Sequence, residues 1–123
     1  MAYEQGLRSI GVPASADLSA SQFCFMVVNS SGQLALPSAG GDVDGILQDK
    51  PNAVGVEAQL GILGVSKLTV GAAGVTAGDL IQTDAAGKAV TAATTGHKIL
   101  GKALATGAAG VVIPFLFQQK GSV

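Results

Sequence analysis

Residues 54–70 read VGVEAQLGILGVSKLTV, and this stretch determines the fold class. Its even-numbered positions are mostly apolar. The odd-numbered positions include the polar residues Glu57, Gln59, Lys67 and Thr69. Alternation with a period of two over this length is typical of a β-strand with one buried face. The glycines in this stretch predict that the strand bends or breaks at Gly61 or at Gly64.

The segments around this strand read as short apolar runs separated by turn signals. QFCFMVV, NSSG and QLALP predict a hairpin over residues 23–36, VDGILQ predicts a strand, and LIQTDAAGKAVTAA predicts a second hairpin. VVIPFLF predicts a last strand, with Pro114 at an edge or a bulge. No stretch shows a helical stripe, although Asp17 would cap one short turn in SADLSASQF. We therefore expect an all-β fold: a compact small β-barrel or sandwich of short antiparallel strands with an extended N-terminal arm.

The first residues differ from the rest. MAYEQGLRSIGVPAS has no sustained period and contains Gly6, Gly11 and Pro13, which oppose regular structure. We expect residues 1–15 to form an extended arm and residues 16–123 a single β domain. The arm carries four apolar side chains without an alternating partner in their own segment, and we expect these to contact a neighbouring subunit: Tyr3, Leu7, Ile10 and Val12.

Composition argues against several classes of protein. Only 12% of the 123 residues are charged, about half the usual share, so neutral surface is left for a partner to cover. The net charge is −1 and the basic residues are scattered, which argues against nucleic acid as a partner. The longest apolar run has seven residues and the N-terminus lacks an apolar core, so neither a membrane span nor a signal peptide is expected. The lone Cys24 reads as a buried small hydrophobe.

No segment predicts an active site. GHKILGKA at 96–103 has the glycine and lysine of a phosphate-binding loop, but Ala103 stands where the magnesium-binding hydroxyl is needed. A strand whose Gly101 allows a neighbouring segment to pack closely explains these letters better. The single His97 reads as a loop residue. Asp42 and Asp44 lack the later ligands of a calcium loop. We expect no enzyme activity, no catalytic or metal-binding residues and no cofactor.

The sequence also contains a weak internal repeat. NSSGQLAL at 29–36 matches DAAGKAVT at 84–91, and VDGIL at 43–47 matches ILGKA at 99–103. The displacement along the chain is nearly the same in both matches, and we call it the repeat offset. Shared turn chemistry is an alternative source of the same letters. A true duplication predicts that residues 23–57 and 78–113 have the same strand order.

The order of these pieces over residues 16–117 resembles the small capsid decoration (cement) proteins of tailed bacteriophages. The matching features are GILQDKP, the V-x-V strand that follows, VTAGDLIQTDAAGKAVTAA, and LGKALATGAAG before the terminal strand. The resemblance implies a non-enzymatic β domain that binds the outer surface of an assembled phage head and stabilises it. Its implied partners are the major capsid protein lattice and further copies of itself, a trimer by analogy. It further implies a place on the outer capsid surface of the virion after synthesis in the bacterial cytoplasm.

Two other classes remain open. One is a different virion structural module, such as a fibre or tail component, which longer repeats or a second domain would favour. The other is an enzyme or small-molecule-binding barrel, which would need polar groups converging at one barrel mouth. Small side chains suit a structural module, because they lose little rotamer entropy when an interface forms.

Overall fold

The computed structural model describes residues 2–123 and is all-β. Within this range the regular structure consists of nine strands, with no helix. They are β1 (Gln5–Pro13), β2 (Phe25–Val28), β3 (Leu34–Ala35), β4 (Gly45–Leu47), β5 (Glu57–Thr69), β6 (Leu80–Thr83), β7 (Ala89–Thr91), β8 (Gly101–Ala103) and β9 (Val112–Phe117). Over residues 2–123 the structure contains no helix long and apolar enough to cross a membrane.

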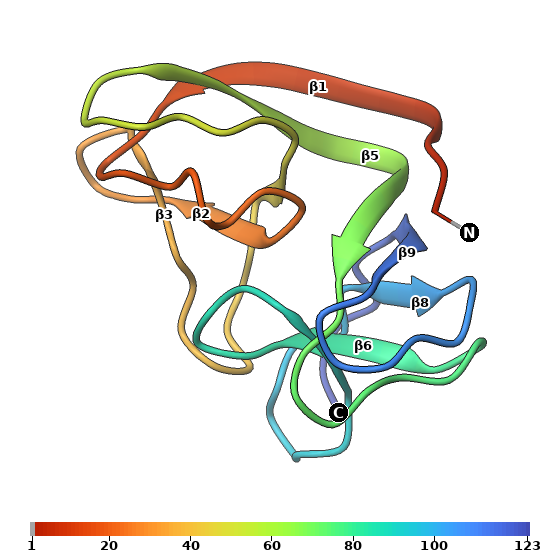
Figure 1. The fold of residues 1–123 in the computed structure, drawn as a ribbon. Helices are drawn as coiled ribbons and strands as arrows, with labels where there is room; N and C mark the ends of the chain where they lie inside the picture. Colours follow the sequence, from red (N-terminus) through yellow and green to blue (C-terminus); the bar gives the residue numbers. More distant parts are fainter. Residues whose placement is uncertain (1) are drawn as a thin grey trace.

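The strands form one antiparallel sheet that curls into a half-barrel (Figure 1). Along the sheet the order is β3-β2-β4-β5-β9-β8-β6-β7, and β1 pairs with β5 outside this path. The predicted all-β class and both predicted hairpins are confirmed, since β2 pairs with β3 and β6 pairs with β7.

The long strand β5 links the two halves of the sheet and is bent along its length (Figure 1). Gly64 has a φ of 106°, a conformation that side-chain-bearing residues rarely adopt. A β-carbon at this position would also meet the carbonyl of Gly6 on β1. Before the bend β5 pairs with β1 and β4, and from Gly64 onward it pairs with β9, although Val65 still pairs with Gln5 of β1. The predicted bend is therefore confirmed, and it turns one strand into two segments with different neighbours.

Two clusters of buried apolar side chains fill the inside of the sheet. One cluster centres on Phe25, Phe115 and Phe117, and the rings of Phe25 and Phe115 meet edge to face with centroids 5.5 Å apart. The other includes Val12, Met26 and Leu60. Burial of each such side chain contributes about 1.5–3 kcal/mol, so these clusters supply the main stabilisation of a chain with few charges.

The two halves of the sheet have the same strand order, as the duplication predicts. Reading toward the middle gives β3-β2-β4-β5 on one side and β7-β6-β8-β9 on the other. The registers repeat as well: Phe25 pairs with Ile46, and Leu80 pairs with Lys102, so both partners are displaced by the repeat offset. Shared turn letters alone would not reproduce strand order and register together, so we conclude that the chain is duplicated.

The hairpin turns repeat down to single hydrogen bonds. In the first hairpin the Asn29 side-chain oxygen accepts from the amides of Ser31 and Gln33 at 2.9 and 3.0 Å. In the second hairpin the Asp84 carboxylate accepts from the equivalent amides, those of Ala86 and Lys88, at 2.9 and 2.8 Å. Each turn closes on a glycine with positive φ, 75° at Gly32 and 77° at Gly87. The turn residues that match in the sequence therefore adopt the same structure in both halves of the chain.

The duplicated unit is longer than the sequence indicated, because β1 is the counterpart of the second part of β5. Val12 pairs with Ala58, and at the repeat offset Leu68 pairs with Ile113. The amide of Ala14 donates to Val56, and that of Val70 donates to Val111, both at 2.9 Å. We call residues 10–62 the first repeat and residues 66–117 the second repeat.

Two expectations differ from the structure. Residues 5–13 were expected to lack regular structure, yet they form a strand; its pattern is hidden because both faces are largely exposed and the register shifts around Arg8. Pro114 was expected at an edge or bulge, but β9 lies between β5 and β8 in regular register. The missing amide is tolerated because β8 ends at Ala103, just short of this position.

Candidate interaction surfaces

The four apolar residues predicted at the N-terminus differ in exposure. Tyr3 and Ile10 are 43% and 44% exposed, whereas Leu7 is half-buried and Val12 is 8% exposed. Val12 belongs to the core cluster that also contains Ala58 and Leu60 of β5. Of the four, Tyr3 and Ile10 thus present the most surface to a partner, and Val12 belongs mainly to the core.

The outer edge of β1 is open, whereas the equivalent edge in the second repeat is covered. After the bend in β5, the amide of Thr69 donates to the carbonyl of Phe23 at 2.8 Å, and its hydroxyl donates to Gln22 at 3.3 Å. Lys67 also lies over the Phe23 ring, 5.4 Å from its centroid. The counterpart of Thr69 on β1 is Pro13, which has no amide to donate. The first repeat therefore covers the second, while its own equivalent edge remains available.

Ten large apolar side chains are exposed on the described surface. They are Tyr3, Ile10, Leu36, Val54, Val56, Leu63, Leu80, Leu104, Val111 and Val123. Sequence reasoning singled out only two of them, Tyr3 and Ile10. Leu80 and Leu104 looked like ordinary strand residues, and only comparison with their counterparts in the first repeat, the buried Phe25 and the half-buried Gln48, marks them as unusual.

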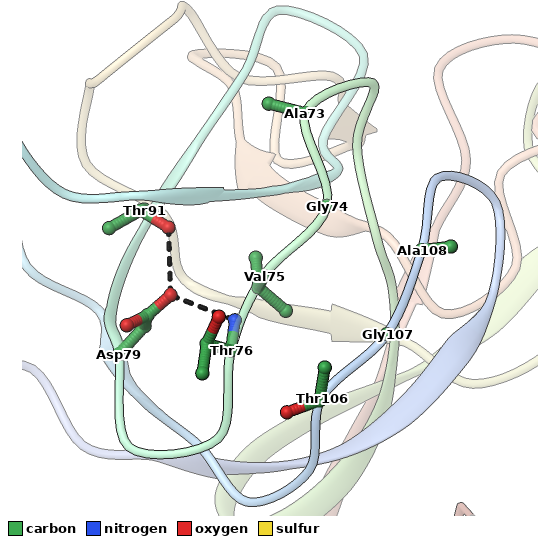
Figure 2. A pocket seen from close by; sticks show the side chains of 9 residues that line it. All are labelled: Ala73, Gly74, Val75, Thr76, Asp79, Thr91, Thr106, Gly107 and Ala108. Carbon is green, nitrogen blue, oxygen red and sulfur yellow. Dashed lines mark hydrogen bonds between the residues drawn. The ribbon is translucent and has the colours of Figure 1, made fainter.

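A shallow pocket of about 480 Å³ opens in the second repeat (Figure 2). Its lining consists of Ala73, Gly74, Val75, Thr76, Asp79, Thr91, Thr106, Gly107 and Ala108. One oxygen of Asp79 accepts from the Thr76 amide at 2.9 Å and from the Thr91 hydroxyl at 3.0 Å. Asp79 is the single titratable group of this lining, and its hydrogen bonds tie the loop to β7. The pocket thus carries a structural network and no acid–base pair.

The stretch that resembled a phosphate-binding loop is part of the sheet. Residues 101–103 form β8 between β6 and β9, where a phosphate-binding loop would need a strand end and a helix. A β-carbon on Gly101 would meet the Leu116 carbonyl and the Phe115 ring. The interpretation of Gly101 as a close-packing position is confirmed.

The other titratable side chains that the sequence singled out lie apart. Cys24 is 2% exposed, and burial raises the pKa of its thiol, which confirms the interpretation as a buried hydrophobe. His97 lies in a loop and packs against Gly40, where a β-carbon would meet its ring. Asp44 accepts from the amide of Val28 at 2.7 Å, and Asp42 is exposed. Over residues 2–123, no three His, Cys, Asp or Glu side chains gather as metal ligands.

Asp17 closes a local turn. Its carboxylate accepts from the amide and the hydroxyl of Ser19 at 3.0 and 2.6 Å, and the hydroxyl contact is the larger cause of its lowered pKa. The turn-capping role expected for Asp17 is confirmed, although the segment after it is a turn and not a helix.

Comparison with known proteins identifies a solved structure that has a similar fold. No protein-family model matches the chain, and no curated protein matches it. Among solved structures, the chain is similar to the N base of the head fiber gp8.5 of bacteriophage phi29, with a TM-score of 0.73 and 13% sequence identity. The match covers 95% of this chain and 98% of that chain. The two chains therefore share a fold over nearly their whole lengths.

Proposed function

We propose that this protein is a non-enzymatic structural component of a phage virion, and more specifically a capsid decoration (cement) protein. The observation that carries the proposal is the fold shared with a phage head fiber base over 95% of the chain. The decoration-protein resemblance of residues 16–117 points to the same class of particle independently of that comparison.

The surface chemistry supports a binding module. Few charges and several exposed apolar side chains give a surface that a protein partner can desolvate at low cost. The interior is filled by two apolar clusters, and the one pocket described above contains a single titratable side chain. We propose the major capsid protein lattice as the partner and the outer surface of the head as the location. Binding only to the assembled lattice would stabilise it by mass action.

A head fibre base is the second candidate. The specific observation in its favour is the name of the similar structure, which is a fiber base and not a decoration protein. Both candidates place the chain on a phage head. They differ in what attachment does: a decoration protein stabilises the shell, whereas a fibre base mainly anchors a longer structure.

The N-terminal segment is proposed to contribute to attachment through Tyr3 and Leu7. Tyr3 is the better anchor, because it leaves over two-fifths of its surface exposed. Several such segments on one oligomer would act together through avidity.

The test is sedimentation of purified protein with heads that lack it, followed by heat challenge of the heads. A decoration protein should saturate the heads and raise the temperature at which they release their DNA. Saturable binding without stabilisation would favour the fibre base. Absence of binding to heads from the phage that encodes the chain would contradict both. Tyr3→Ala should weaken binding, whereas Val54→Ala, exposed but outside the N-terminal segment, serves as the matched control.

A further inference from the structure

The two repeats meet through two different surfaces. The first repeat contributes the residues around β2 and the end of β4, and the second contributes the later part of β5 together with β9. Gln48 donates to the hydroxyl of Ser66 at 2.9 Å, and Phe25 packs against Phe115 and Phe117. Because the two surfaces differ, the contact does not close on itself. Each repeat therefore keeps one open surface whose counterpart is buried in the other repeat.

These open surfaces can be located by applying the repeat offset to the internal contact. On the second repeat the counterparts of Phe25, Ile46 and Gln48 are Leu80, Lys102 and Leu104, which we call the second outer face. On the first repeat the counterparts of Ser66, Leu100 and Phe117 are Ile10, Asp44 and Ile62, which we call the first outer face.

Both outer faces expose large apolar side chains, and exposure of such side chains to water does not stabilise a monomer. Leu80, Leu104 and Ile10 are 37%, 36% and 44% exposed. Phe25, the counterpart of Leu80, is fully buried by the second repeat. The second outer face thus keeps part of the apolar character that serves the internal contact.

Side chains at corresponding positions of the two outer faces are complementary in polarity and charge. In the internal contact Gln48 donates a hydrogen bond to Ser66. The equivalent positions on the outer faces hold two apolar side chains, Leu104 in place of Gln48 and Ile10 in place of Ser66. Ile46 and Leu100, which share the internal core cluster, correspond to the exposed side chains Lys102 and Asp44. In each case the polarity changes on both surfaces together, to an apolar pair in one place and to opposite charges in the other.

The chain after β9 takes a different path from the chain after the first repeat. At the internal junction the chain runs on from the first repeat into the second through the bend of β5. After Phe117 the chain instead stays beside the segment that precedes β8, where the amides of Gln118 and Lys120 donate to Leu100 and Ile99 at 2.9 Å.

We propose that the second outer face of one copy docks on the first outer face of another, head to tail, and so repeats the contact that joins the two repeats. Leu104 then packs against Ile10, and Lys102 pairs with Asp44. A contact between unlike surfaces closes into a ring or extends into a filament. This association does not depend on capsid binding, so it can be tested on the purified chain alone.

The test is light scattering after size-exclusion chromatography. Wild-type protein should elute at a multiple of the chain mass. Leu104→Asp and Ile10→Asp should each weaken association about tenfold or more, because a buried carboxylate would lack a partner. Val54→Asp, which is 66% exposed and outside both faces, should leave the mass unchanged. Thermal melts establish that each variant folds.

Mixing the two variants distinguishes this contact from a symmetric one. Each variant keeps the face that the other has lost, so a mixture should form a complex of one copy of each. The charge-swapped chain with Lys102→Asp and Asp44→Lys should associate with itself more strongly than either single variant. A wild-type chain that stays monomeric, or folded variants that associate as well as wild type, would overturn the proposal. So would failure of the mixture to combine.

Discussion

The first and second repeats place different side chains on the same backbone. Phe25 and Leu80 occupy equivalent positions, yet one is fully buried and the other is 37% exposed. Phe23 and Gly78, which precede them, both have positive φ, at 62° and 90°. Turns, glycines and pairing registers are thus shared, whereas side-chain character follows what covers each surface. Backbone chemistry sets the unit, and burial between units sets the residue type.

The largest difference in the free energy of unfolding is expected when two equivalent side chains, Phe25 and Leu80, are each truncated to alanine. Phe25→Ala should lower the free energy of unfolding by about 3–5 kcal/mol, because it empties space beside Phe115 and Phe117. Leu80→Ala should cost less than about 1 kcal/mol because much of that side chain is already in water. Urea unfolding in a monomeric Ile10→Asp background measures both. Equal costs would mean that the repeats do not differ in burial.

The next largest loss of stability is expected at two equivalent glycines, Gly45 and Gly101. A β-carbon on Gly45 would meet the Gly61 carbonyl and Leu60, and one on Gly101 would meet their counterparts, the Leu116 carbonyl and Phe115. We expect Gly45→Ala to cost about 1–3 kcal/mol, and Gly101→Ala to cost more because its φ is 155°. Chemical denaturation gives both values. Wild-type stability in either variant would refute the close approach in that repeat.

A smaller effect is expected in the turns. Asp84→Ala should cost about 1–2 kcal/mol, since two backbone amides lose their acceptor. Asp84→Asn should cost less than about 0.5 kcal/mol, because Asn29 makes the same two bonds in the first repeat. Thermal melts of both variants, with Asn29→Ala alongside, provide the comparison. A large cost for Asp84→Asn would show that the turns are not equivalent.

The smallest effect concerns Cys24, the counterpart of Asp79. Burial raises the pKa of the thiol, so its neutral form predominates near neutral pH and the residue should resist thiol reagents until the chain unfolds. Because the pKa is higher in the folded state, the contribution of the thiol to the free energy of unfolding is complete at pH values below the pKa of the unfolded thiol. This contribution is lost as the pH rises through the pKa of the folded state. Rapid labelling of native protein would contradict the burial.

The sequence predicted what short-range patterns encode. Alternation around Leu60 predicted β5, and the letters around Asn29 and Asp84 predicted both hairpins and the repeat offset. It did not predict β1, because that strand has only one partner and an irregular register near Arg8. The sequence also wrongly predicted an edge or a bulge at Pro114, and the equivalent position in the first repeat explains why. Its counterpart Gln59 uses the amide to bond the Asp49 side chain and not a strand, so the position never required a backbone partner.

The surfaces could be predicted only in part. Apolar residues near the N-terminus were visible in the sequence, but Val12 proved to be in the core and Leu104 was not recognised. Exposure of a strand residue depends on which segments of the folded chain cover it. Reading one repeat against the other supplies that information, because it shows which positions are covered in only one of them.

The chain consists of two copies of one unit, and residues 10–14 begin the first copy. The amides of Ala14 and Val70 are equivalent donors, to Val56 and Val111. Hydrogen exchange of the purified protein measures both directly. Both amides should exchange far more slowly than in an unstructured peptide. Exchange of Ala14 at the unprotected rate, with Val70 protected, would contradict this prediction and return residues 1–15 to an arm outside the domain.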